Sequence, residues 1–113
     1  MGLPNALDIA HAVRAAVPDA TPVGVRLSGT DWVEGGWDLE QTVAISRALE
    51  ARGCAFLDIS SGGLSHRQQI PLGPGYQVRF AAQVKAAVNI PVVAVGLITD
   101  PAQAEAILAE GQA

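Results

Sequence analysis

One pattern recurs three times along the 113-residue chain and leaves few folds open to it. A short apolar run is followed by turn residues and then by a segment with helical spacing of its apolar residues, and the pattern returns about every 30 to 40 residues. Strands that are apolar throughout are typical of a parallel sheet covered by helices. The sequence therefore predicts an α/β fold, which both a segment of an α/β barrel and a doubly wound sheet satisfy.

Local signals set the expected helix ends. Asp38 and Asp100 each precede a helical pattern and have a glutamine three residues further on, which is the spacing of a capping box. Gly53 and Gly111 stand where these helices should end, because glycine tolerates the left-handed conformation after a last turn. The expected elements are a leading helix over about 6–17, strands over 23–28, 55–60 and 91–96, and helices over 38–53, 76–88 and 100–111.

The apolar spacing also predicts which helix faces are buried. Three of the predicted helices carry apolar residues on one stripe, and small alanines lie between them in the second of these helices. The expected buried residues are Ile9, Ala12, Val13 and Ala16 in the leading helix, Val43, Ile45 and Leu49 in the next, and Tyr76, Phe80, Val84 and Ala87 in the third.

Charge and composition limit the partners and the location. Half of the residues are hydrophobic, the formal net charge is -4, and Lys and Arg form no cluster, which argues against nucleic acid and acidic membranes as partners. The single cysteine, Cys54, cannot form an internal disulfide. The N-terminus lacks the layout of a signal peptide and no apolar run is long enough for a bilayer, so we expect a cytoplasmic protein with small-molecule ligands.

Three strands are few for a parallel sheet. Such a sheet has two apolar edges, and natural folds seldom leave edges of this kind bare. We therefore expect residues 1–113 to form a single partial domain, either a piece of a larger fold or a chain that assembles with another.

Ligands of parallel α/β folds bind at the carboxyl ends of the strands, and Arg26 lies near one of these ends. A buried guanidinium is costly unless it is paired and hydrogen-bonded. Side chains alternate along a strand, so Arg26 meets a structural carboxylate, Asp58, if the faces of the two strands coincide. The other possibility is that Arg26 faces a ligand.

The other strand ends also carry residues that a plain core strand does not need. Gly96 lacks a Cβ where the third strand gives way to a helix, so an anion could approach backbone N–H groups and the positive helix end; alternatively, glycine merely permits a tight turn. The loop over 60–77 is long, and long loops in compact domains are usually functional or mobile. It contains His66 and Arg67, but a lone loop histidine is more often solvated than catalytic.

Four further side chains are expected to have structural roles. Trp32 and Trp37 either wall an aromatic ligand pocket or cover the end of the sheet, and the second reading is favoured. His11 is expected to face solvent, and Cys54 to be a small buried core residue and no nucleophile. The sequence contains no paired Cys/His metal set and no serine nucleophile elbow.

Five segments together carry a resemblance to a known family. In chain order they are "VRLSGTDW", "DLEQTVAISRALEARG", "FLDISSGG", "PGYQVRFAAQVK" and "PVVAVGLITDPAQAEAIL". They resemble the second half of an Old Yellow Enzyme barrel, more narrowly the NADH:flavin oxidoreductases of the YqjM and xenobiotic-reductase type. The resemblance implies a partial (β/α)8 TIM barrel in which the three predicted strands correspond to strands five to seven.

The resemblance also implies a cofactor and its contacts. Proteins of this family hold FMN and reduce activated alkenes with electrons from NAD(P)H. Arg26 matches the arginine that points at the N1/O2 edge of the flavin, where negative charge accumulates on reduction. Gly96 and Leu97 match the turn whose N–H groups hold the FMN phosphate, while Ser61 and Gln77 fall in segments that line the flavin.

The catalytic residues of that family have no match here. Its substrate-binding histidine pair and proton-donating tyrosine belong to the front half of the barrel, and neither His66 nor Tyr76 corresponds to them. The expected function is therefore a fragment of an FMN-dependent ene-reductase that supplies part of the FMN site, is inactive alone and needs a complementing barrel half. Two alternatives stay open: a non-catalytic, self-associating half-barrel module with at most weak phosphate or flavin binding, and a different phosphate-binding barrel.

Overall fold

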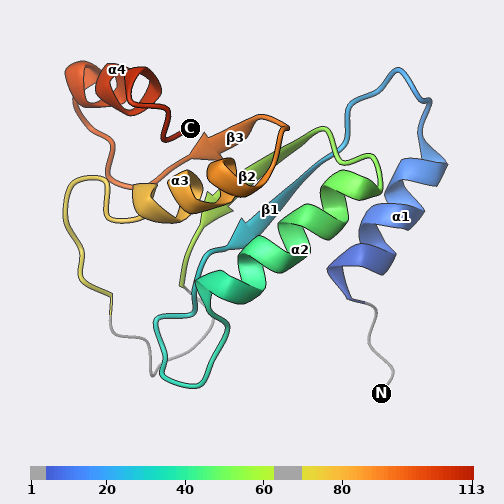
Figure 1. The fold of residues 1–113 in the computed structure, drawn as a ribbon, viewed down its shortest axis with the longest axis horizontal. Helices are drawn as coiled ribbons and strands as arrows, with labels where there is room; N and C mark the ends of the chain where they lie inside the picture. Colours follow the sequence, from blue (N-terminus) through green and yellow to red (C-terminus); the bar gives the residue numbers. More distant parts are fainter. Residues whose placement is uncertain (1–4, 63–69) are drawn as a thin grey trace.

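The computed structural model describes residues 5–62 and 70–113, and the elements follow one another in the order that the sequence predicts. Figure 1 shows how the strands and the helices that connect and flank them are arranged. The expected boundaries are confirmed to within a few residues. The elements are α1 (Ala6–Ala16), β1 (Gly24–Ser28), α2 (Leu39–Ala51), β2 (Phe56–Ser60), α3 (Val78–Ala87), β3 (Val92–Ala94) and α4 (Pro101–Ala109).

The strands form one parallel sheet in the order β1-β2-β3. Arg26 of β1 is paired in register with Asp58 of β2, which in turn is paired with Val93 of β3. Since paired residues of adjacent strands point to the same side, these three side chains lie on one face of the sheet. The expected parallel α/β arrangement is thus confirmed.

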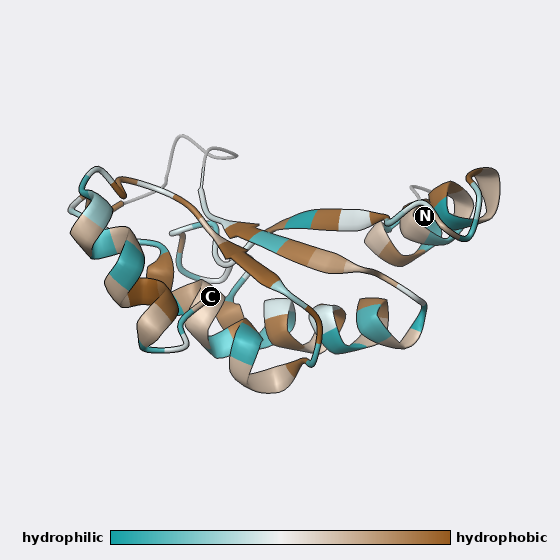
Figure 2. Cartoon of the chain, turned by 90° about the horizontal axis from the view of Figure 1, so that it is seen from above, coloured by the Kyte–Doolittle hydropathy of each residue, from teal (hydrophilic) through white to brown (hydrophobic). Residues whose placement is uncertain are grey.

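The two faces of the sheet have different surroundings. In Figure 2, α2 and α3 lie beneath the strands, and no helix of the described ranges covers the other face. The core therefore forms between the strands and these two helices, and helix α1 packs beside α2. The most deeply buried large side chains of this core are Leu49, Leu57, Ile59, Phe80 and Val84. We call the uncovered side, which carries Arg26, Asp58 and Val93, the open face.

Helix α2 begins and ends as its sequence signals predict, but its buried face differs from the expected one. Asp38 and Gln41 form the predicted reciprocal capping box, and Gly53 has the left-handed φ of 89° after the helix. Leu49 is fully buried as expected. The other fully buried positions are Thr42 and Ser46, whereas the expected Val43 and Ile45 are only partly buried.

The buried stripe predicted for α1 is wrong. Ile9, Ala12, Val13 and Ala16 are all exposed, and the helix instead contacts the core through Leu7 and Ala10. Nothing in the described part of the chain covers the larger apolar stripe. Residue spacing identifies an apolar face, but it cannot tell which of two available faces the rest of the chain covers.

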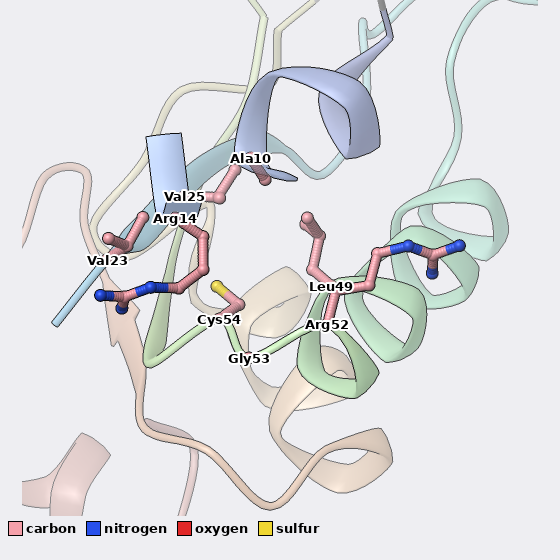
Figure 3. A pocket seen from close by; sticks show the side chains of 8 residues that line it. All are labelled: Ala10, Arg14, Val23, Val25, Leu49, Arg52, Gly53 and Cys54. Atoms are coloured by element: carbon pink, nitrogen blue, oxygen red, sulfur yellow. The ribbon is translucent and has the colours of Figure 1, made fainter. Parts of the chain in front are cut away.

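A small pocket separates α1 from β1 and the end of α2 (Figure 3). Arg14 lies along it and donates from its guanidinium to the backbone oxygens of Pro18 and Thr21. Cys54 is buried here, as expected, and its Sγ donates to the backbone oxygen of Phe56 at 3.2 Å. Burial raises the pKa of the Cys54 thiol because the thiolate is poorly solvated there. His11, on the same helix, is exposed as predicted.

Helix α4 lies beyond β3, and its start departs in one detail from the prediction. Asp100 accepts a hydrogen bond from Ala102 N at 2.8 Å, and Pro101 occupies the first turn as expected. Among the described residues, the reciprocal hydrogen bond of a capping box, in which the Gln103 side chain accepts from Asp100 N, is absent. Gly111 follows the helix with a φ of 73°. Within the described ranges, no helix has both the length and the apolar character needed to cross a membrane.

Candidate cofactor site at the carboxyl ends of the strands

Arg26 contacts the carboxylate that the sequence offered as its structural partner, and its exposure leaves the second possibility, a ligand, open. Its Nε donates to Ser60 Oγ at 3.2 Å, and its Nη1 lies 3.6 Å from Asp58 Oδ2. Its side chain nevertheless remains 62% exposed on the open face. A guanidinium has five N–H donors, so the two contacts orient the group and leave donors available for another partner.

Within the described part of the chain, only one carboxylate oxygen of Asp58 has a partner. Its Oδ2 faces Arg26, while its buried Oδ1 has no hydrogen-bond partner. A buried acceptor without a donor costs free energy, so such groups usually meet a donor from water, a ligand or another chain. Ser60 was not singled out by the sequence reasoning, although strand alternation already puts it on the face of Asp58.

A second polar cluster joins three segments that are distant in sequence. Trp32 Nε1 donates to Ser61 Oγ at 2.7 Å, and Ser61 Oγ donates to Gln77 Oε1 at 2.6 Å. Gln77 Nε2 then donates to the backbone oxygen of Val95 at 2.7 Å. The structure thus brings the predicted residues Ser61 and Gln77 together, with Gln77 only 4% exposed. We call this chain of hydrogen bonds the Trp32 relay.

The relay ends at the turn formed by Gly96 and Leu97. Both residues have a positive φ, 111° and 50°, so the backbone turns sharply where β3 gives way to the segment before α4. A Cβ at Gly96 would lie 2.3 Å from Gln77 Nε2, so both the backbone conformation and the close amide require glycine. The turn therefore has a structural need for glycine in addition to any ligand.

The N–H groups of this turn are available to an anion. In the described ranges, neither Gly96 N nor Leu97 N donates to a backbone acceptor, whereas the oxygen of Leu97 accepts from Gly75 N at 3.1 Å. The nearby start of α4 is less open, because the Asp100 carboxylate already accepts from Ala102 N. The turn itself, more than the helix end, suits a phosphate group.

The two tryptophans have different surroundings. Trp37 Nε1 contacts Ser28 O at 2.9 Å and Thr42 Oγ1 at 2.7 Å, so this ring covers the end of β1, as predicted. Trp32 has a left-handed φ of 59°, stacks against Tyr76 at 6.3 Å between ring centroids, and meets Phe80 edge-on at 5.2 Å. Sequence reasoning missed the polar role of Trp32, because nothing local predicts a partner 29 residues away.

Two expected features cannot be placed. His66 and Arg67 lie outside the described residues. Across 5–62 and 70–113, no group of three or more His, Cys, Asp and Glu side chains is arranged to hold a metal ion.

One solved structure shows which fold this chain resembles. A structure of a 2-naphthoyl-CoA reductase in complex with 2-naphthoyl-CoA superposes with a TM-score of 0.80 and 27% identity, covering 94% of this chain and 17% of that one. That reductase is a TIM barrel. Because the likeness covers nearly all of this chain, its three βα units form a partial barrel and not a doubly wound sheet.

Three curated relatives have oxidoreductase names. An NADH:flavin oxidoreductase from Gibberella zeae is 38% identical over 93% of this chain, an NADH oxidase from Thermoanaerobacter brockii is 38% identical over 95%, and an NADPH dehydrogenase from Listeria innocua is 40% identical over 81%. The chain spans only 29%, 17% and 27% of their respective lengths.

A family model gives the assignment for the chain as a whole. Residues 4–113 match the model described as dihydrouridine synthase (Dus). The curated relatives are named as flavin and nicotinamide oxidoreductases, which supports the expected resemblance at this coarse level. The chain therefore belongs to the dihydrouridine synthase (Dus) family of β/α-barrel proteins.

Proposed function

We propose that this chain supplies part of the FMN site of an NAD(P)H-dependent oxidoreductase of the ene-reductase type, and that turnover requires the rest of a barrel. The observation that carries the proposal is that one sheet presents both an exposed guanidinium, two residues before the end of β1, and a glycine turn after β3 whose N–H groups donate to no backbone acceptor within the described ranges. On this view residues 1–113 form one partial barrel domain corresponding to strands five to seven.

The residues present fit the cofactor in two places. The turn at Gly96 and Leu97 offers N–H donors beside a position without a Cβ, which suits the phosphate. Arg26 carries a fixed positive charge on the open face, and some of its N–H donors remain available. Ser61 and Gln77, at the same end of the sheet, complete the proposed cofactor site.

Bound FMN would supply hydride transfer between NAD(P)H and the activated double bond of a small, enone-like molecule. The contribution of Arg26 would be electrostatic, because its positive charge would stabilise the negative charge that a bound flavin gains on reduction. No residue of this chain is assigned a catalytic role in proton transfer. A complementing barrel half would provide those groups.

The charge of the chain favours a small-molecule substrate over a nucleic acid. A net charge of -4 without a basic cluster offers no attraction to a polyanion. This matters because the family model is named for dihydrouridine, a nucleoside product.

The direct test is a titration of the purified chain with FMN, followed by flavin fluorescence and the visible spectrum. We expect binding that is weakened at least about tenfold in Arg26→Ala, since a charge-assisted contact is lost. Arg47→Ala is the matched control, because Arg47 is an exposed arginine on α2, away from the strand ends. Absence of FMN binding, or equal loss in both variants, would overturn the proposal.

The alternative is a non-catalytic module that associates with itself. It is favoured by the open face, where Phe56 and Val93 are 39% and 45% exposed. A module of this kind predicts assembly without FMN and without turnover, so the same titration, combined with a measurement of mass in solution, distinguishes the two functions.

A further inference from the structure

We infer that Trp32, Ser61 and Gln77 act as positioning residues that hold the Gly96–Leu97 turn in the shape that receives a phosphate. This inference rests on the proposed function and deepens it. Ser61 and Gln77 then serve the cofactor site through the backbone of the turn and not by touching the flavin.

The chemistry of the groups fixes the direction of the relay. An indole N–H only donates, so Ser61 Oγ must accept from Trp32, and the single hydroxyl hydrogen is then directed to Gln77 Oε1. This leaves the amide NH2 of Gln77 facing Val95 O, which only accepts. Reversing the amide would place two acceptor oxygens against each other. One indole N–H thus determines the orientation of an amide two hydrogen bonds away.

The burial of Gln77 and its contact with Gly96 explain how the hydrogen bonds of the Trp32 relay affect the turn. Gln77 is 4% exposed, and its Nε2 occupies the space that a Cβ at Gly96 would fill. Each polar atom of its amide has a protein partner, and burial leaves the Gln77 side chain little surface for a further contact. The amide therefore packs against the turn on one side.

The turn is also held by a backbone hydrogen bond. Gly75 N donates to the oxygen of Leu97 at 3.1 Å, and Gly75 lies just two residues before Gln77. The start of the relay is equally constrained, because Trp32 packs between Tyr76 and Phe80. A positive φ is costly for Leu97, although not for Gly96, so these restraints help to keep the turn in one conformation.

The test compares FMN with riboflavin, which lacks the phosphate. We expect Trp32→Phe and Ser61→Ala to weaken FMN binding about fivefold to tenfold, the usual effect of one hydrogen bond, and to change riboflavin binding less than about twofold. Ser61→Thr keeps the hydroxyl and should restore FMN affinity. Trp37→Phe is the matched control, because it removes an indole N–H that bonds elsewhere. Equal loss of FMN and riboflavin affinity in Ser61→Ala would overturn the inference.

A second measurement needs no ligand. Amide hydrogen exchange of Gly75 reports on its bond to Leu97, and it should speed up about fivefold to tenfold in Ser61→Ala and Trp32→Phe but not in Trp37→Phe. Unchanged exchange in both relay variants would refute the positioning role even if FMN binds. Faster exchange in the relay variants of a chain that binds neither FMN nor riboflavin would support the positioning role of the Trp32 relay and overturn the proposed function. The two failures are therefore distinguishable.

Discussion

At the level of single residues, the Arg26 side chain combines a weak ion pair with wide exposure. A contact of 3.6 Å to Asp58 at an exposed site is screened by water and contributes little to stability. We expect Arg26→Ala to change the free energy of unfolding by less than about 1 kcal/mol, measured by urea denaturation. A loss of several kcal/mol would mean that Arg26 is a structural residue and would remove the reason to assign it to a ligand.

Gly96 is under two constraints, a positive φ and a close neighbour, and a comparison with a second glycine separates their effects. Gly96→Ala should destabilise the chain by about 1–3 kcal/mol, since the new Cβ meets Gln77 Nε2 and the φ of 111° is strained for alanine. Gly35 also has a positive φ, 77°, but open space around it. Gly35→Ala should therefore cost less than Gly96→Ala in the same denaturation experiment, and equal costs would show that the contact with Gln77 is unimportant.

The buried thiol of Cys54 gives a prediction that depends on pH. Burial raises its pKa, so the folded chain keeps the thiol proton to a higher pH than the unfolded chain does. The contribution of this group to stability must then fall as the pH rises above the ordinary thiol pKa. Alkylation by iodoacetamide at pH 8 should be slower for the folded chain than for the chain in concentrated urea. A folded-state rate that matches the urea rate would contradict this.

At the level of elements, α2 shows what sequence patterns reveal and what they miss. Its capping box and terminal glycine were predictable because they depend on residues a few positions apart. Burial of Thr42 was not, because it depends on Trp37 folding back over the end of β1. Thr42 Oγ1 accepts from that indole and contacts Ser28 O at 2.8 Å, so a polar side chain is satisfied inside the core.

Two buried hydroxyls of α2 should therefore differ in importance. Thr42→Val removes a buried hydroxyl that accepts from Trp37 Nε1 and donates to Ser28 O, and we expect a loss of about 0.5–1.5 kcal/mol of stability. Ser46 Oγ only donates back to Thr42 O within the helix, an interaction that adds little, so Ser46→Ala should be nearly neutral. Thermal denaturation of both variants checks the order. A larger effect in Ser46→Ala would contradict our account of this core.

At the level of the whole molecule, the sequence allowed the parallel sheet to be predicted and pointed to a candidate site, but it did not predict the contacts within that site. The parallel sheet followed from the repeated βα pattern, and the candidate position at the carboxyl ends followed from the direction of parallel strands. The Trp32 relay joins three loops and could not be read from any one of them. The open face was likewise hidden, because helix periodicity does not say how many helices a sheet will have on each side.

The open face leads to a last prediction. It exposes the apolar side chains of Phe56 and Val93, and within the described ranges the strands β1 and β3 each have an unpaired edge. Exposed apolar surface next to bare strand edges favours association, because both can be buried against another chain. We expect the purified chain to sediment as a species heavier than a monomer and to bind a hydrophobic dye.

A charge on this face should oppose the association. Val93 is paired with Asp58 and its side chain projects from the open face, so Val93→Lys should shift the chain toward the monomer and reduce dye binding while the core beneath stays intact. Ala109→Lys adds the same single charge on an exposed position of α4 and is the matched control. If the wild-type chain is monomeric and binds no dye at high concentration, the open face does not drive association. A complementing barrel half would then have to be recognised mainly through the strand edges.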